Sequence, residues 1–142
     1  MGQLVRAFFE RYERANSSSD LTAIAGLYGD TFLFGGPNGV QAVKKEDFLK
    51  VVPRMKSHFA SLGLSATELQ SVEAGALDSR YLLAQVGWRM ILQNFSGRSM
   101  HVNAAATYIL ERTGADSLSI VFQIDHQDLA TVIRNQQTAR TP

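Results

Sequence analysis

Two side chains in this sequence have the chemistry of a proton donor and a proton acceptor. Tyr12 carries a phenol that can donate a hydrogen bond to a developing oxyanion, and His126 carries an imidazole that can accept a proton near neutral pH. Asp125 and Asp128 flank His126 in the segment DHQD. Adjacent residues of a strand point to opposite faces of a sheet, so we expect Asp125 not to contact the His126 ring. Tyr12 and His126 are therefore the candidate catalytic residues.

Few other groups in the chain suit catalysis or metal binding. His101 is expected on the strand face opposite Met100 and Val102, and whether His101 or His126 faces a pocket is open. The sequence contains no cysteine, which excludes thiol nucleophiles and thiolate metal sites. It has no HExxH motif, no histidine pair at helical spacing and no phosphate-binding glycine loop. We expect neither a metal nor a cofactor.

The first third of the chain predicts two helices and a strand that would position Tyr12. Apolar residues recur at intervals of three and four over 3–15, which predicts a helix with Tyr12 on its buried side. Asp20 is expected to cap a short second helix by accepting from its first backbone N–H groups. The β-branched and aromatic run 31–34 predicts a short strand, and the glycine-rich segment 35–39 predicts a turn.

The remaining sequence predicts a third helix followed by a long antiparallel meander. The helix covers 45–62 and ends at Gly63, and Pro53 inside it is expected to introduce a kink or a break. Alternating apolar residues predict three strands, at 80–94, 98–112 and 118–126. A more weakly patterned strand is expected before them, at 65–77. Long strands usually bend, and a bent sheet can enclose a cavity against the helices.

Length and composition indicate the class of protein and exclude several kinds of partner. The 142 residues suit one domain, 1–142, and 45% hydrophobic with 19% charged residues are typical of a soluble globular chain. The formal net charge of +1, without a basic stripe, argues against a nucleic-acid partner. No apolar run reaches the roughly 18–20 residues of a membrane span, and no signal peptide is evident. We expect a cytoplasmic protein without a membrane partner.

This order of elements resembles the NTF2-like superfamily, also described as the cystatin-like or SnoaL-like cone, over nearly the whole chain. The similarity is most specific at Tyr12, at the Asp20-Leu21 entry to the second helix, in LYGDTF at 27–32 and in the PNG turn at 37–39. The resemblance implies an α+β fold in which N-terminal helices pack into a strongly curved antiparallel sheet. It also implies a mostly apolar pocket between the helices and the sheet, and commonly a homodimer.

Segment 11–39 is similar, without a gap, to the ketosteroid isomerase branch of this superfamily. In that branch a tyrosine of the first helix donates to the enolate oxygen, and Tyr12 falls on its place. The buried acid that shares the donor role corresponds to about Ala106, and the general base corresponds to Gly36. Neither alanine nor glycine can move a proton, so the comparison argues against ketosteroid isomerase activity despite the aligned tyrosine.

Three functions from different classes remain open. The first is a binding protein for a small hydrophobic molecule, in a pocket lined by Tyr12, Tyr28, Phe34, Phe59, Trp88, Met90 and Phe122, although each of these is also a suitable core residue. The second is a cofactor-independent lyase, hydratase or isomerase similar to SnoaL-like cyclases, with Tyr12 as acid or oxyanion donor and His126 as base. The third is a dimeric interaction module, because nuclear transport factors use this fold.

The outward-pointing side chains of the long strands predict a homodimer through the outer face of the sheet. This face is more apolar than a solvated surface requires, with Leu83, Ile91, Ala105 and Ile109 beside His101 and Asn103. The expected partners are therefore a small hydrophobic molecule and a second copy of the chain.

Overall fold

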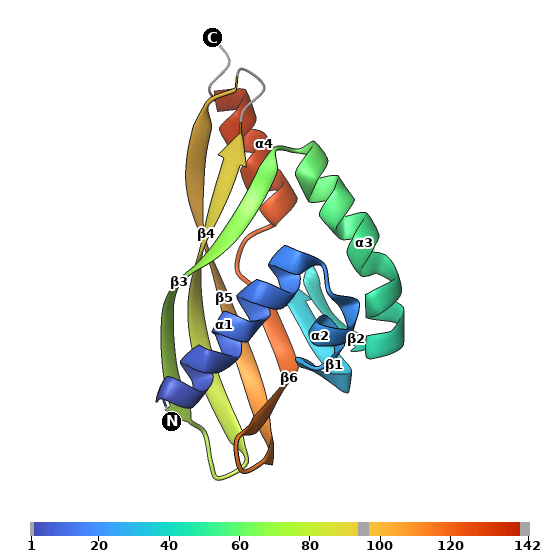
Figure 1. The fold of residues 1–142 in the computed structure, drawn as a ribbon, viewed down its shortest axis with the longest axis vertical. Helices are drawn as coiled ribbons and strands as arrows, with labels where there is room; N and C mark the ends of the chain where they lie inside the picture. The colour runs from blue at the N-terminus through green and yellow to red at the C-terminus, as the bar shows by residue number, and fades with distance from the viewer. Residues whose placement is uncertain (1, 94–96, 140–142) are drawn as a thin grey trace.

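One bent, six-stranded sheet carries the fold over the described residues, which are 2–93 and 97–139 of this computed structural model (Figure 1). In chain order the elements are α1 (Gly2–Ser18), α2 (Leu21–Ala25), β1 (Tyr28–Gly36), β2 (Gly39–Lys44), α3 (Lys45–Ser61), β3 (Leu64–Ala76), β4 (Tyr81–Gln93), β5 (Ser99–Gly114), β6 (Ser117–Asp125) and α4 (Leu129–Ala139). The predicted α+β architecture is confirmed. We call the sheet face that packs against α1 the inner face, and the opposite face the outer face.

The strands are joined as a meander with a hairpin added at its end. Their order across the sheet is β2-β1-β6-β5-β4-β3. All neighbours run antiparallel except β1 and β6, which are parallel. The sequence did not predict β2 or the β1–β6 pairing. The predicted glycine turn is reduced to Pro37 and Asn38, because Gly36, the last residue of β1, already pairs with Gly39, the first residue of β2.

The predicted helix ends are confirmed where a specific side chain or glycine sets them. The Ala23 N–H donates to Asp20 Oδ1 at 3.1 Å, which caps α2. Gly63 follows α3 with a φ of +107°, a left-handed conformation that favours glycine. Pro53 lies inside α3 without splitting it. No described helix is both long and apolar enough to cross a membrane.

Aromatic packing between α1 and the inner face forms the centre of the core. Phe9 is fully buried, and its ring centroid lies 4.7 Å from that of Tyr108 and 6.4 Å from that of Trp88. Tyr12, one helical turn later, places its ring 5.2 Å from that of Trp88. The alternation predicted for 80–94 is confirmed over the described part of β4, whose even-numbered residues from Leu82 to Leu92 are buried. Residues 94–96, which include most of the turn predicted at 95–97, lie outside the described residues.

A one-residue bulge changes which residues of β6 face inward. Ile120 pairs with Leu110, but Phe122 pairs with Ile109, so the register shifts by one residue between them. Phe122 therefore lies on the outer face with Ile109, whereas simple alternation predicted it among the pocket residues. After the bulge, Gln123 pairs with the inward-facing Tyr108. The bulge thus brings polar side chains onto the inner face.

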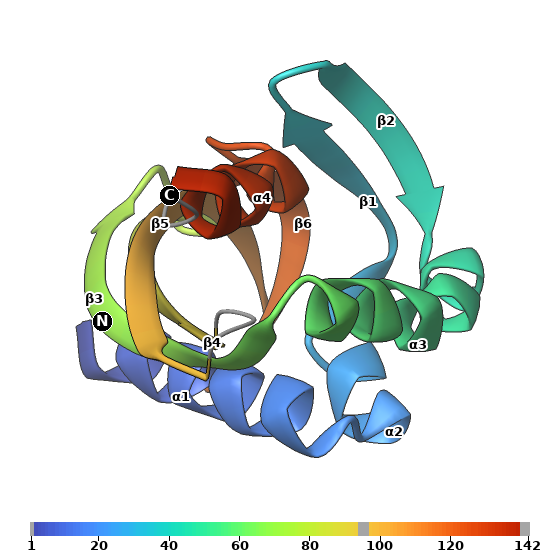
Figure 2. The ribbon, with the colours of Figure 1, turned by 90° about the horizontal axis from the view of Figure 1, so that it is seen from above.

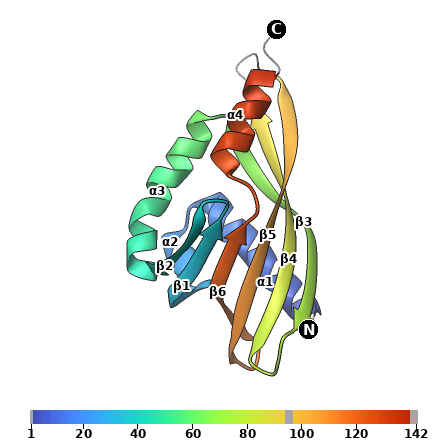
Figure 3. The ribbon, with the colours of Figure 1, turned by 180° about the vertical axis from the view of Figure 1, so that it is seen from behind.

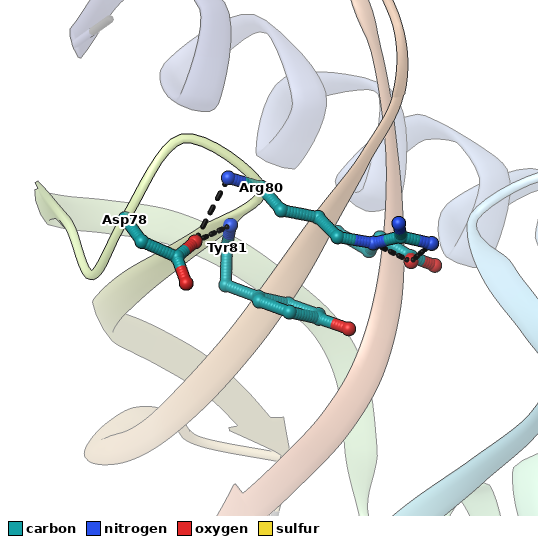
Figure 4. Close-up of polar contacts among 4 residues, drawn as sticks. Asp78, Arg80 and Tyr81 are labelled. Atoms are coloured by element: carbon teal, nitrogen blue, oxygen red, sulfur yellow. Dashed lines mark hydrogen bonds and ion pairs between the residues drawn. The ribbon is translucent and has the colours of Figure 1, made fainter.

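The turn between β3 and β4, residues 77–80, is stabilised by side-chain hydrogen bonds (Figure 4). Asp78 Oδ1 accepts from the backbone N–H groups of Arg80 and Tyr81, both at 2.8 Å. Hydrogen bonds from Tyr81 and then Arg80 hold the pKa of the Asp78 carboxyl below its usual value. The Arg80 guanidinium reaches Glu111 on β5 at 2.6 Å, so this turn is structural.

Phe9 provides a direct test of the packing between α1 and the sheet. We expect Phe9→Ala to lower the free energy of unfolding by about 3–5 kcal/mol, because it removes a buried ring and leaves a cavity among four other aromatic rings. Leu77→Ala, at a side chain that is 56% exposed, is the matched control and should change stability by less than about 0.5 kcal/mol. Urea unfolding measures both. A similar small effect at both positions would contradict the packing described.

Candidate functional site

A chain of hydrogen bonds on the inner face links side chains from three elements. Gln123 Nε2 on β6 donates to Asp125 Oδ1 at 3.2 Å. The Tyr28 hydroxyl, from the start of β1, donates to Gln123 Oε1 at 2.7 Å. The Tyr28 and Tyr12 hydroxyl oxygens lie 3.4 Å apart, so the chain continues to α1. The parallel pairing of β1 with β6 is what places Tyr28 beside Gln123.

A second branch reaches Tyr12 from the long strands. The Trp88 indole N–H on β4 donates to the Tyr108 hydroxyl on β5 at 3.2 Å. The Tyr108 hydroxyl in turn hydrogen-bonds to Tyr12 and lowers its pKa. Tyr12 therefore stands where the two branches meet. We call these six side chains, Tyr12, Tyr28, Trp88, Tyr108, Gln123 and Asp125, the inner polar network.

Four members of the inner polar network are buried, and we call these four the closed members; the other two are half-buried. Tyr28 is 4% exposed and Tyr108 is 1% exposed, and Trp88 and Gln123 are also buried. Tyr12 and Asp125 are only half-buried. Buried hydroxyl, indole and amide groups are costly without partners, and here each closed member has one. The partly exposed surface of the network therefore belongs to Tyr12 and Asp125, while burial of their polar groups still raises both pKa values.

The phenols of the network act as hydrogen-bond donors at neutral pH. Burial raises the pKa of Tyr12, hydrogen-bonding contacts, chiefly the one with Tyr28, oppose that rise, and the Asp125 charge adds to it. Burial raises the pKa values of Tyr28 and Tyr108 well above the usual tyrosine value. All three groups therefore keep their protons.

Asp125 is the member of the network that can exchange a proton nearest to neutral pH. Burial raises the pKa of its carboxyl, while the Gln123 hydrogen bond and then the nearby His126 oppose the rise. Its carboxyl also lies on the same face as Ala106, directly across the β5–β6 pair. A carboxyl group thus lies on the inner face, one strand away from Ala106.

The Tyr12 hydroxyl makes one long hydrogen-bonding contact within the network. Tyr28 has one hydroxyl proton, and the 2.7 Å contact to Gln123 takes it in preference to the 3.4 Å contact to Tyr12. Tyr108 accepts from Trp88 and is a donor to Tyr12. Tyr12 therefore has three hydrogen-bonding neighbours in the network, which are Tyr28, Tyr108 and Gln123. Its contact with Tyr28 is long, and an acceptor oxygen of a bound molecule could replace that contact at a shorter distance.

The structure does not bring His126 to Tyr12. His126 Nε2 lies 2.7 Å from Thr107 Oγ1, and Thr107 is on the outer face because its neighbours Ala106 and Tyr108 face inward. His126 borders an outer-face hollow of about 290 Å³ together with Ser71, Glu73 and Gln85. His101 is also exposed on the outer face, with Nδ1 3.4 Å from Arg89 Nη2. Neither histidine faces the inner polar network.

The predicted pocket residues separate into three groups. Tyr12, Tyr28 and Trp88 belong to the inner polar network, and Phe34 packs half-buried against the same core. Phe59 and Met90 belong to a second apolar cluster, which also contains Ile133 of α4. Phe122 is on the outer face. None of the seven lines the larger hollow of about 590 Å³, which lies between α1 and β3 near Glu13, Glu68 and Arg89.

Asp125 and Gln123 were missed by the sequence reasoning for a definite physical reason. Alternation along 118–126 would point Gln123 and Asp125 outward, and the bulge before them reverses this. The polar residues that close an otherwise apolar run are the only sequence signal for them. Among the described residues, no three histidine or acidic side chains gather as a metal site.

Similar proteins of known structure share this fold. Aln2 from Streptomyces sp. is 14% identical with a TM-score of 0.70, over 90% of this chain and 91% of that one. An NTF2-like protein with a cystatin-like fold from Novosphingobium aromaticivorans is also 14% identical with a TM-score of 0.70, over 92% and 86%. A ketosteroid isomerase-like protein from Erwinia carotovora atroseptica is 15% identical with a TM-score of 0.64, over 89% and 95%. These similarities define an NTF2-like fold and, at such identities, nothing finer.

The family follows from the sequence match. A family model described as NTF2-like protein (DUF6841) matches residues 2–128, and the chain belongs to that family. No curated protein matches the chain significantly. The resemblance to the NTF2-like superfamily is confirmed.

Asp125 should make the stability of the protein depend on pH in a characteristic way. Its raised pKa means that ionisation is less favourable in the folded than in the unfolded chain, so stability falls as pH rises from the usual carboxyl value through the folded value. Asp125→Asn removes that loss. We expect the difference in Tm, variant minus wild type, to increase between about pH 4 and about pH 8.

The control for this measurement is Asp116→Asn, in the exposed turn between β5 and β6. Its difference from wild type should stay nearly constant over the same series. A flat or falling difference for Asp125→Asn, measured by thermal unfolding, would show that the carboxyl is not desolvated in the folded chain.

Proposed function

We propose that this protein binds a small, mostly apolar molecule that presents one oxygen to Tyr12 and Asp125. The observation that carries the proposal is the inner polar network, whose only half-buried members are these two groups. An apolar surface with a few convergent polar groups is the usual composition of a small-molecule site. Aromatic rings of Phe9, Trp88 and Tyr108 supply the apolar surface around Tyr12.

The charges at the site favour a neutral ligand over an anion. Tyr12 offers a proton, which suits a carbonyl, ether or hydroxyl oxygen. Asp125 carries the nearby negative charge when it is ionised, and this repels a carboxylate or phosphate. A neutral ring or chain bearing a single carbonyl or hydroxyl group fits both conditions.

A second candidate function is acid–base catalysis on such a molecule, without a cofactor. The observation that favours it is the raised pKa of Asp125 beside a phenol that keeps its proton. Tyr12 would stabilise an oxyanion, and Asp125 would take the proton-transfer role for which His126 lies on the wrong face. Gly36 and Ala106 still argue against the ketosteroid isomerase mechanism.

Binding of 4-hexylphenol tests the proposed function, because this neutral molecule combines one hydroxyl with an apolar chain. We expect Tyr12→Phe to weaken binding by about fivefold, since it removes one hydrogen bond worth about 1 kcal/mol. Tyr81→Phe, at a tyrosine outside the network, should bind as wild type does. Isothermal titration calorimetry measures all three. Absent binding, or equal affinities for Tyr12→Phe and wild type, would rule the proposal out.

We also propose that the protein forms a homodimer through the outer face of the sheet. Ser71, Gly87 and Ala105 lie in one row across three strands, and their small side chains leave the outer-face hollow. Half-buried apolar residues, Leu83, Ile91 and Ile109, lie around this row. Phe122 adds to the same surface. An apolar patch with a central hollow suits contact with a second copy.

Ala105→Glu places a charge at the centre of this surface and is expected to convert a dimer into a monomer. Ala60→Glu makes the same change at an exposed position of α3 and should leave the dimer intact. Light scattering at micromolar concentrations gives the mass of each protein, and circular dichroism checks that each is folded. A monomeric wild-type protein would contradict the proposal.

A further inference from the structure

We propose that α4 is a movable plug of the ligand site, and that Ile133 occupies the space that the apolar part of a ligand takes. This inference rests on the proposed binding function and extends it to how the ligand enters and which chemical class it has. The ligand would be an amphipathic neutral molecule, with its oxygen at Tyr12 and Asp125 and an aliphatic tail under α4.

Ile133 packs into an apolar cluster whose other buried members come from other elements. We call the space that its side chain occupies there the apolar chamber. Its side chain is 0% exposed, and it packs in one cluster with the buried residues Met90, Leu92, Met100 and Ala104 of β4 and β5. Half-buried residues around that cluster include Phe59 and Leu62 of α3 and its C-cap, and Leu129 at the start of α4. Figures 2 and 3 both show α4 beside β5.

The chamber under α4 adjoins the inner polar network. On β5, Ala104 is two residues from Ala106, which faces Asp125 across the strand pair. Ala104 also pairs with Trp88, whose ring lies 5.2 Å from that of Tyr12. Two residues of a strand span about 7 Å, so a tail of a few carbon atoms connects the polar end with the space of Ile133.

The segment before α4 is tied to β5, and few of the described side chains of α4 are buried. The His126 N–H donates to the Ala105 carbonyl at 3.2 Å, and Gln127 Oε1 accepts from the Ala105 N–H at 3.1 Å, which ties the preceding segment to β5. Among the described side chains of α4, residues 129–136, Ile133 alone is buried. Helices of this length are marginal on their own, and segments with few buried contacts open locally.

The helix α4 lies beyond the residues that the family model matches. The matched residues end at 128, and α4 begins at Leu129. The inner polar network therefore lies wholly within the matched part, whereas the residue that fills the apolar chamber lies outside it. Removing Ile133 from the chamber leaves every contact of the network in place.

Thiol labelling measures whether α4 opens, because the natural chain has no cysteine. Ile133→Cys places a single thiol in the chamber from α4, and Leu92→Cys places one in the same cluster from β4, at an equally buried position. We expect a disulfide reagent under native conditions to label the Ile133→Cys protein at least about tenfold faster. Equal labelling rates would overturn the proposal. Denaturant unfolding of both variants confirms that each is folded.

A ligand with a tail distinguishes displacement of α4 from simple covering by it. Saturating 4-hexylphenol should accelerate labelling of the Ile133→Cys protein about threefold or more, because the tail competes with this position. The short analogue 4-methylphenol should leave the rate unchanged. If 4-hexylphenol binds with the expected dependence on Tyr12 but slows labelling or leaves it unchanged, the plug is overturned and the binding function stands. If 4-hexylphenol shows no Tyr12-dependent binding, the binding function itself fails.

Discussion

The register of β6 is the constraint on which the inner site depends. Side chains alternate along a strand with a period of two, so a single extra residue exchanges the two faces for everything that follows. The shift between Ile120 and Phe122 turns Gln123 and Asp125 inward and Phe122 outward. Without it, the carboxylate and the amide would lie on the outer face, and the Tyr28 hydroxyl would have no partner on β6.

The parallel pairing of β1 with β6 supplies the partner for the Gln123 side chain that the bulge turns inward. It places Tyr28 at the edge of the meander, where its hydroxyl reaches Gln123. Burying a phenol or an amide without a partner costs about 1–3 kcal/mol, so each hydrogen bond in the closed part restricts the position of the next group. The half-buried Tyr12 is thereby held by packing and by a hydrogen-bonded neighbour on two sides. A donor held in this way needs little reorganisation when an acceptor arrives.

The elements with strong local signals were predictable from the sequence, and those created by tertiary contacts were not. The helical stripe with Phe9, the Asp20 cap and the alternation of β4 follow from local rules of spacing and capping, and each was found. β2 is short and exposed, and it becomes a strand by pairing with β1. The bulge in β6 leaves no mark in the hydrophobic pattern. Tyr12 was therefore found as a site residue, whereas Asp125 was set aside.

Side chains of the protein fill both the polar half and the apolar half of the inner space. The proposed ligand would therefore have to replace some of their contacts. In the polar half every closed group has a protein partner, and the half-buried Tyr12 has a long contact with Tyr28. In the apolar half Ile133 supplies the packing that a tail would supply. A ligand therefore gains only the difference between its own contacts and those that it replaces. A molecule with an oxygen alone replaces little, and a molecule with a tail alone leaves Tyr12 unused. For the proposed ligand, selectivity would arise from the requirement to satisfy both halves at once, at the spacing between Ala106 and Ala104 on β5.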